Sequence, residues 1–223
     1  MAKLYLVPTP IGNLEDLTFR AVRILKAVGI IFSEDTRTTG NLLTHYDIKN
    51  QLKPYHIHNE HQKLEEYVRL IQQFETAALT SDAGTPCISD PGFLLVRACL
   101  ENDIEVECLP GATAFVPALV NSGFSSDKFA FYGFVPHKKG KQTLIKRIAE
   151  SDMTSIVYES PHRLLKTLEL MKEIMGEERK ICISRELTKF YEENLRGSIQ
   201  ECITHFSEKG IKGEIVICVS ATL

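Results

Sequence analysis

The sequence predicts an α/β protein made of two α/β domains. Short apolar runs alternate with longer stretches whose apolar residues recur at helical spacing, and this alternation breaks once, at the small and polar residues 121–127. Such alternation is typical of a mainly parallel sheet with helices on its faces. A length of 223 residues is enough for two domains that each bury a core. We therefore expect one α/β domain over residues 1–120 and a second over residues 121–223.

Four strands are expected in the first domain, at residues 4–7, 29–33, 76–80 and 104–109. Helices separate them. Asp16 is the expected cap of a helix that carries Phe19, Val22 and Leu25 on one face, and a second helix repeats this spacing at Leu64, Val68 and Ile71.

A third helix is expected to begin at Asp90 and Pro91 and to continue to about Asn102. Proline suits the first helical position, and an aspartate before it can accept hydrogen bonds from the free amides. In the second domain the strands are expected at residues 128–134, 155–158, 181–184 and 214–220, with helices at 143–149 and 162–175.

Charge and cysteine usage limit the class of protein. The chain has 26 basic and 29 acidic residues, so no global field indicates a nucleic-acid or membrane partner, although the second domain is slightly basic. The six cysteines form no C-x-x-C pair and mostly lie among apolar residues, as free thiols do in a reducing compartment. No apolar run approaches the roughly 20 residues of a membrane span. We expect a cytoplasmic protein with no membrane partner.

Four loops follow the expected strands of the first domain. They read "PTPIGN" (8–13), "EDTR" (34–37), "SDAGTP" (81–86) and "PGAT" (110–113). In an open parallel sheet, ligands bind outside the carboxyl ends of the strands, so these loops are expected to share one ligand-binding edge. Their glycines allow close approach of backbone to a ligand, and Asp82 offers a carboxylate to amino or hydroxyl groups. The needs of a tight turn can explain the composition of any one of these loops. They explain the composition of all four together less well.

Several enzyme classes lose their sequence support. The chain contains neither G-x-x-x-x-G-K-[ST] nor G-x-G-x-x-G, which disfavours phosphate and hydride transfer, and it has no G-x-S-x-G elbow of a hydrolase. His56, His58 and His61 form a candidate metal set, but their positions on a strand end and a helix start favour a solvated loop. We expect no metal.

Three stretches of the second domain carry charge. Residues 137–147, "HKKGKQTLIKR", have five basic residues and no acid, so they suit either RNA phosphates or a solvated helix face. "YESPHR" (158–163) and "RELTK" (185–189) each follow an expected strand with mixed charge. Structural ion pairs explain either one alone, and the two together at strand ends favour a site.

These stretches together resemble one known family. "LVPTPIGNLEDLTFRA", "EDTRTTGNLL", "SDAGTPCISDPG", "LPGATA", "YESPHRL", "RELTK" and "KGEIVI" occur in the order found in the ribosomal RNA small subunit methyltransferase I family, within the tetrapyrrole methylase superfamily. The resemblance covers nearly the whole chain. It implies two α/β domains, a mainly parallel sheet in the first and a mixed sheet in the second, with S-adenosylmethionine in a cleft between them. It also implies a homodimer that methylates the ribose 2′-hydroxyl of a cytidine in 16S ribosomal RNA, on the RNA or on the small ribosomal subunit.

The resemblance assigns residues to the methyl donor. The superfamily's donor loop corresponds to Asp82, Ala83, Gly84 and Thr85, and the segment after its Pro-Gly turn corresponds to Thr113 and Ala114. Further donor contacts are expected from Pro10, Gly213 and Glu214.

The resemblance also leaves a set of candidate catalytic residues. Methyl transfer depends on positioning, and a base near the hydroxyl would assist it. The carboxylates Glu34, Asp35 and Glu186 are candidates for that base, with no choice among them. The basic candidates, which would hold phosphates or tune the hydroxyl, are Arg37, Arg163, Arg185 and Lys189.

Two alternatives stay open from the sequence. One is a tetrapyrrole methyltransferase that acts on a corrin precursor, and the other is a non-catalytic protein that binds the cofactor or RNA. Tetrapyrrole members tend to carry a glycine-rich first loop such as G-x-G-P-G-D, whereas this chain has "VPTPIGN" there. The first loop therefore favours the RNA methyltransferase.

Overall fold

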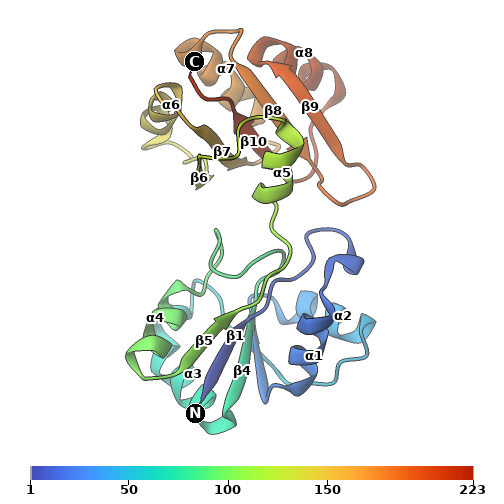
Figure 1. Ribbon diagram of the computed structural model, residues 1–223, viewed down its shortest axis with the longest axis vertical. Helices are drawn as coiled ribbons and strands as arrows, with labels where there is room; N and C mark the ends of the chain where they lie inside the picture. The colour runs from blue at the N-terminus through green and yellow to red at the C-terminus, as the bar shows by residue number, and fades with distance from the viewer. Residues whose placement is uncertain (1, 223) are drawn as a thin grey trace. The chain divides into compact units, whose positions relative to one another are not determined.

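The computed structural model describes residues 2–222, and their contacts divide the chain into two compact units, Met1–Thr113 and Ala114–Leu223 (Figure 1). Each unit has its own five-stranded sheet. The fold class expected from the sequence, two α/β domains, is confirmed.

The first unit contains a parallel sheet with the strand order β3-β2-β4-β1-β5. Its strands are β1 (Lys3–Leu6), β2 (Ile30–Ser33), β3 (Leu52–Pro54), β4 (Thr76–Thr80) and β5 (Glu105–Cys108). Its helices are η1 (Leu14–Asp16), α1 (Phe19–Ala27), α2 (Thr36–His45), α3 (Glu60–Phe74) and α4 (Phe93–Glu101).

Successive residues of the central strands feed two cores on opposite faces of this sheet. Leu4, Leu6 and Phe32 pack with apolar residues of α3 and α4, whereas Val7 and Ile31 pack with those of α1 and α2. This alternation follows from the pleat of a strand, which points successive side chains to opposite faces. With both faces covered by helices, the ligand-accessible part of the sheet is its edge of strand ends.

The second unit contains a mixed sheet with the strand order β6-β7-β10-β8-β9. Only β6 and β7 pair in parallel, and the other pairs are antiparallel. Its strands are β6 (Phe129–Phe134), β7 (Thr154–Glu159), β8 (Lys180–Arg185), β9 (Glu193–Ser198) and β10 (Ile215–Val219). Its helices are α5 (Phe115–Ser122), α6 (Lys141–Ala149), α7 (Leu164–Met175) and α8 (Ile199–Lys209).

The two units divide earlier than residue 120. The expected division between residues 120 and 121 falls inside α5, whereas the contacts separate Thr113 from Ala114. The physical reason is that α5 packs against β7, β8, β9 and β10 of the second sheet. Its Ala118 and Leu119 are buried.

Two expected helix starts are wrong. The cap of α1 is Thr18, whose side chain accepts a hydrogen bond from the amide of Ala21, while Asp16 lies in the short helix η1. Helix α4 begins at Phe93 after Gly92, because the backbone at Gly92 has φ 138° and breaks the helix that Asp90 and Pro91 were expected to open.

Six elements were not expected from the sequence: η1, α2, β3, α5, α8 and β9. Asp35, taken as part of a loop, caps α2 by accepting a hydrogen bond from the amide of Arg37. Strand β9 is an edge strand with partly exposed polar residues, so it lacks the apolar run of a buried strand. Helix α8 begins at a capping box in which Ser198 and Glu201 bond each other's backbone amides.

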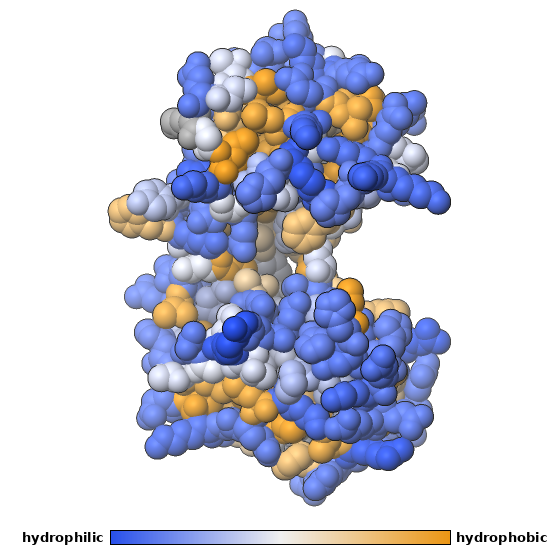
Figure 2. Space-filling view, turned by 180° about the vertical axis from the view of Figure 1, so that it is seen from behind, coloured by the Kyte–Doolittle hydropathy of each residue, from blue (hydrophilic) through white to orange (hydrophobic). Residues whose placement is uncertain are grey.

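The described residues contain no helix that is both long and apolar enough to cross a bilayer. Figure 2 shows hydrophilic residues over much of one face of each unit, with hydrophobic residues in separate patches. All six cysteines are free thiols, as expected; four of them are buried, and Cys108 is exposed.

Candidate functional site

The carboxyl edge of the first sheet has a switch point between β1 and β4. The chain leaves β1 toward β2 on one side, and it leaves β4 toward β5 on the other side. Connections that diverge from neighbouring strands leave a crevice between the loops that follow them, and ligands of open α/β sheets bind there. The loops concerned are residues 8–13 and 81–86.

A pair of backbone hydrogen bonds joins these two loops. The amide of Thr9 donates to the carbonyl of Gly84, and the amide of Gly84 donates to the carbonyl of Thr9, each over 2.9 Å. The Thr9 hydroxyl donates to the carbonyl of Ser81 at 3.0 Å, and the Ser81 hydroxyl donates to Gly84 at 3.1 Å. Thr9, Ser81 and Gly84 are all buried. The loops therefore form one cross-linked unit.

Glycine is required at two places in this unit. Gly84 has φ 84°, in the left-handed region, and a Cβ at Gly111 would lie 2.6 Å from the Cβ of Pro8. The hydroxyl of Thr85 donates to the carbonyl of Ala112 at 3.0 Å, which ties the loop after β5 to the loop after β4. Three of the four predicted loops are thus brought together by specific contacts.

The fourth loop, after β2, joins them through a carboxylate. The Asp82 side chain accepts a hydrogen bond from the amide of Asp35 at 3.0 Å. Asp35 in turn holds Arg37, which donates from Nη2 at 2.7 Å and from Nε at 3.2 Å. The Arg37 guanidinium is therefore already paired with Asp35, the cap of its own helix α2.

Acidic groups gather at this edge and change one another's pKa. Burial, followed by repulsion from Asp82, raises the pKa of Glu34. Burial also raises the pKa of Asp82, although the Asp35 amide opposes this. Burial together with the charges of Glu34 and Asp82 raises the pKa of Asp90 to about 7. By contrast, hydrogen bonds from Arg37 lower the pKa of Asp35 to about 2. The edge therefore holds three carboxyls that favour a cation nearby.

The second sheet aligns the other predicted residues along one of its edges. Ile215, the first residue of β10, pairs with Glu159 on β7 and with Arg185 on β8, and Arg185 pairs with Glu193 on β9. "YESPHR", "RELTK" and the Gly213–Glu214 pair consequently lie along the same edge of this sheet. The two motifs do follow strands, as the sequence predicts, and the register brings them to one edge.

Arg163 belongs to a buried network at this edge. Its Nη2 lies 2.6 Å from the fully buried carboxylate of Glu159, and its Nη1 donates to the carbonyl of Val135 at 3.0 Å. The Thr167 hydroxyl donates to Glu159 at 2.5 Å and accepts from Lys141 Nζ at 2.8 Å. Through these contacts the Glu159 carboxylate holds together the end of β6, the start of α6 and the start of α7.

Glu186 and Lys189 form a second network with Glu214. Glu186 Oε1 accepts from Lys189 Nζ at 2.8 Å and from the amide of Glu214 at 3.0 Å, and Lys189 also lies 3.0 Å from Glu214 Oε2. Burial alone would raise the pKa of Glu186, but these two hydrogen bonds keep it below its ordinary value. A Cβ at Gly213 would lie 2.4 Å from Glu186 Cδ, so only glycine fits there.

The four predicted cations are all engaged in ion pairs, which the sequence could not show. Arg37 pairs with Asp35, Arg163 with Glu159, Arg185 with Glu193, and Lys189 with Glu186 and Glu214. In the basic stretch 137–147, the exposed basic residues are Lys138, Lys139, Lys146 and Arg147, and no ion pair between described side chains uses any of them. These four are better candidates for phosphate contacts than the paired cations.

The remaining predicted residues lie nearby in sequence but make fewer contacts. Pro10 is half-buried next to Thr9, and Ala83 is exposed beside Asp82. Thr113 and Ala114 are half-buried at the connection where one unit ends and the other begins. His56 lies near enough to Glu34 to oppose the rise of its pKa. No group of histidine, cysteine or acidic residues among residues 2–222 has the arrangement of a metal site.

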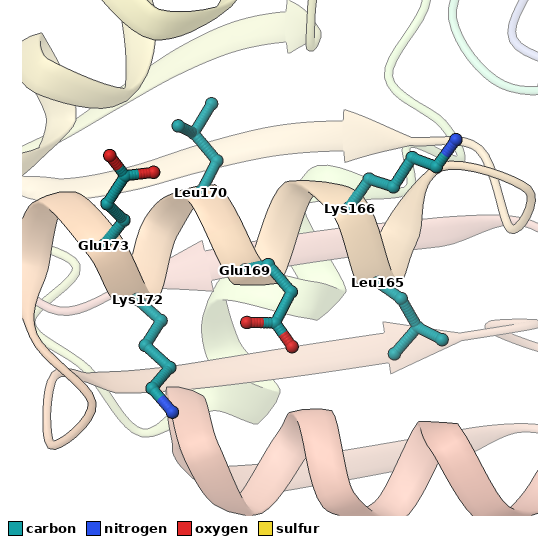
Figure 3. A pocket seen from close by; sticks show the side chains of 6 residues that line it. All are labelled: Leu165, Lys166, Glu169, Leu170, Lys172 and Glu173. Carbon is teal, nitrogen blue, oxygen red and sulfur yellow. The ribbon is translucent and has the colours of Figure 1, made fainter.

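An open hollow of the second unit lies on α7, apart from the predicted residues. Figure 3 shows the side chains that line it, with Leu170 and Glu173 on one side of the helix and Glu169 and Lys172 on the other. The Lys172 ammonium donates to Gln200 of α8. None of the predicted site residues contributes to this hollow.

Sequence reasoning missed three residues of these sites. Asp90 was taken as a helix cap and lies instead with the acidic group. Thr9 was inside a quoted loop, but its pairing with Gly84 joins positions far apart in the chain. Glu159 was inside "YESPHR", where full burial of its side chain was not expected. An acid among apolar strand residues was the available signal for Glu159.

Comparison with known proteins agrees with this geometry. The profile of the family Tetrapyrrole (Corrin/Porphyrin) Methylases matches residues 3–203. A ribosomal RNA small subunit methyltransferase I from Synechocystis sp. is 48% identical over 206 residues, which is 92% of this chain and 74% of that protein. The chain belongs to the ribosomal RNA small subunit methyltransferase I family. A member from Haemophilus influenzae is 52% identical over 85% of this chain and 67% of its own length, and one from Thermotoga maritima is 43% identical over 92% of both.

The fold extends to a wider set of methyltransferases. The crystal structure of uroporphyrin-III-C-methyltransferase from Thermus thermophilus aligns with a TM-score of 0.70 at 19% identity, covering 99% of this chain and 94% of that one. At that identity the likeness shows the fold alone. Membership in the ribosomal RNA small subunit methyltransferase I family rests on relatives at 43–52% identity, so the tetrapyrrole alternative gains no support.

The acidic edge predicts a dependence of stability on pH. Asp90 has a folded-state pKa of about 7 against an ordinary value of 3.8, so it destabilises the fold increasingly as the pH rises between these values. Asp90→Asn removes this cost. Because water screens part of the charge interaction, we take the gain in the free energy of unfolding as roughly 1 kcal/mol. At pH 8 the melting temperature of the variant should then exceed that of the wild type by about 2 to 4 °C, the shift that such a gain gives in a chain of this size.

At pH 4 the difference in melting temperature should be much smaller, because Asp90 is then protonated in the folded state and only about half ionised in the unfolded state, whose pKa is close to 3.8. The matched control is Asp152→Asn, which changes an exposed aspartate of the second unit. Thermal unfolding by circular dichroism at both pH values gives the comparison. An Asp90→Asn effect that is the same at pH 4 and pH 8 would contradict the acidic coupling.

Proposed function

We propose that this chain is an S-adenosylmethionine-dependent methyltransferase that methylates the ribose 2′-hydroxyl of a cytidine in 16S ribosomal RNA. The observation that carries the proposal is the cross-linked pair of loops at the β1/β4 switch point, with Asp82 exposed beside Gly84. The relatives' shared name, ribosomal RNA small subunit methyltransferase I, supports the same activity. Their name contains the substrate class, and the loop geometry supplies a place for the methyl donor.

The residues at the switch point fit this donor. S-adenosylmethionine carries a positive sulfur and an ammonium group, and the carboxyls of Glu34, Asp82 and Asp90 leave this edge short of positive charge. Neutral or cationic loops would lack this electrostatic match.

When bound, S-adenosylmethionine supplies a methyl group on a positively charged sulfur. Residues 82–85 would hold it, with Asp82 accepting hydrogen bonds from its amino or hydroxyl groups. The Thr9–Gly84 bonds keep these loops in one shape, so little ordering remains to be done on binding. Pro10, Thr113, Ala114, Gly213 and Glu214 stay as further proposed donor contacts.

Among the three carboxylates proposed as the base, Glu34 has the most suitable chemistry. A general base must be deprotonated at the operating pH and still basic enough to take a proton, so a raised pKa suits the role, and burial and Asp82 raise the pKa of Glu34. Asp35, with a pKa of about 2, is paired to Arg37, and Glu186 is paired to Lys189. We therefore assign proton acceptance to Glu34, and assign Asp35 and Glu186 to orienting Arg37 and Lys189.

The paired cations take positioning roles in this proposal. Arg163 holds Glu159, and Arg185 holds Glu193, so neither is available to bind a phosphate without losing a partner. Lys138 and Lys139 contact the phosphates instead. The substrate is proposed to be the assembled small ribosomal subunit in the cytoplasm, which would supply shape around one nucleotide. The active species is proposed to be a homodimer, as the family resemblance implies.

Donor binding and label transfer test the proposal. Calorimetry should show that the wild type binds S-adenosylhomocysteine, and Asp82→Ala should weaken this binding at least about tenfold because it removes a charged hydrogen-bond acceptor. Asp127→Ala, an exposed aspartate of the second unit, is the matched control and should bind normally.

With a labelled donor and undermethylated small subunits, digestion of the RNA to nucleosides should place the label on a cytidine ribose. Label on a base or on a corrin precursor would defeat the proposed substrate. Absence of any donor binding by the wild type would defeat the proposed cofactor.

Single-turnover kinetics test the assignment of the base. Glu34→Gln should slow methyl transfer by about 100-fold or more, the usual contribution of a positioned base, with binding of S-adenosylhomocysteine retained. Glu186→Gln keeps the shape of its side chain and should slow transfer less. A normal rate in Glu34→Gln with a severe loss in Glu186→Gln would instead make Glu186 the base.

A further inference from the structure

The second sheet has one face that helices cover only in part. Helices α6, α7 and α8 supply the buried core on one side of the sheet. On the other side, α5 packs against β7, β8, β9 and β10. Strand β6 lies at the end of the strand order, next to β7, and its side chains complete this second face with aromatic residues.

Five aromatic residues make up this surface, which we call the aromatic face: Phe115, Phe129, Phe131, Phe134 and Tyr158. Their rings form a connected series. Phe115 stacks on Phe131 with centroids 4.6 Å apart, Phe131 meets Tyr158 edge to face at 4.9 Å, and Phe134 meets Tyr158 at 5.3 Å. Such packing holds each ring in a fixed orientation.

The two ends of the series are open to solvent. Phe129 is 42% exposed and Phe134 is 56% exposed, while the three rings between them are half-buried. Exposed aromatic rings that pack against half-buried neighbours lose little entropy when a planar ligand stacks on them. An aromatic face of this kind on a sheet is a stacking platform for unpaired bases.

The edge of β6 itself is poorly suited to pairing with another strand. Its register with β7 shifts between Phe131 and Phe134, and Gly133 within that interval has φ 66°. Irregularities of this kind interrupt the row of amides and carbonyls that strand addition needs. The face of β6, and not its edge, is therefore the surface available to a ligand.

Charge at the end of β6 favours a polyanion over a second copy of the chain. Lys138 and Lys139 follow Phe134 closely and are exposed, while Glu159, the acid at the neighbouring strand end, is buried and neutralised by Arg163. A two-fold dimer through this face would bring the same lysines of both copies near each other, and like charges repel. RNA phosphates would attract them.

We propose that the aromatic face binds single-stranded RNA, with bases stacked on Phe129 and Phe134 and the adjoining phosphates contacted by Lys138 and Lys139. The inference deepens the proposed function and rests on it, since it names where an RNA substrate binds. Stacking tolerates any base, so the face holds a strand near the site without choosing its sequence.

The test uses the full chain and two fluorescent oligoribonucleotides of equal length, an unstructured oligocytidine and its abasic analogue. Fluorescence anisotropy gives the affinities over a range of salt concentrations. The variants are Phe129→Leu, Phe134→Leu, their combination and Phe134→Trp, and a separate variant carries Lys138→Gln with Lys139→Gln. Phe19→Leu is the matched control, because Phe19 is 97% exposed on the first unit.

Each leucine substitution should weaken binding of the oligocytidine by about tenfold and leave binding of the abasic analogue unchanged. Phe134→Trp should bind as the wild type, because it keeps an aromatic surface. The slope of log affinity against log salt should stay the same in the leucine variants and flatten in the lysine variant.

For the wild type, equal affinity for the two oligonucleotides, or no binding of either, would overturn the inference. For the leucine variants, binding equal to that of the wild type would overturn it. So would conversion of a dimer to a monomer in sedimentation, which would assign the face to a second copy. The oligonucleotide comparison on the wild type needs no substitution, so a variant that fails to fold does not remove the test. Donor binding and label transfer by the wild type are measured separately, so failure of the proposed function is distinguished from failure of this inference.

Discussion

The two backbone hydrogen bonds between Thr9 and Gly84 are the constraint on which the first unit's site depends. They join loops that leave neighbouring strands in opposite directions, and such loops would otherwise diverge into solvent. Ser81 and Thr85 extend the cross-link to the carbonyls of Gly84 and Ala112. Because these bonds are internal, Asp82 and Ala83 are left at the exposed turn of an otherwise buried loop. The atoms proposed to face the methyl donor are thus positioned by buried ones.

The strand ends of the two units differ in charge, and each charge suits a different partner of the proposed reaction. The strand ends of the first unit carry carboxyls whose pKa is raised by burial and, for Asp90, also by the charges of Glu34 and Asp82; this acidic group suits a cationic methyl donor and repels phosphates. In the second unit the acids at the strand ends are neutralised by ion pairs, and the exposed Lys138 and Lys139 follow the aromatic strand β6 in the chain. The surfaces that would attract a cationic small molecule and a polyanionic strand therefore lie on different units, although the net charge of the chain is only -3.

Sequence patterns predicted what depends on local or periodic features and missed what depends on distant contacts. The buried strands were found because their apolar runs are continuous, and the four loops at the sheet edge because they follow those strands. Strand β9 was missed because an edge strand needs few apolar residues. Asp90 was misplaced because "DPG" has the composition of a helix start, while φ 138° at Gly92 delays the helix. The ion pairs of Arg163, Arg185 and Lys189 could not be predicted, since each depends on register or on a turn that brings a carboxylate within reach.

Amide hydrogen exchange on the ligand-free chain tests the central claim that the loops are cross-linked before any donor binds. The amides of Thr9 and Gly84 should exchange as slowly as those of Leu6 and Leu79 in the adjoining strands, since all four lie in hydrogen bonds at the same buried edge. The amide of Ala83, at the exposed turn, should exchange quickly in the same sample. Fast exchange at Thr9 and Gly84, with protection that appears only when S-adenosylhomocysteine is added, would show that the ligand forms the site and would contradict the account.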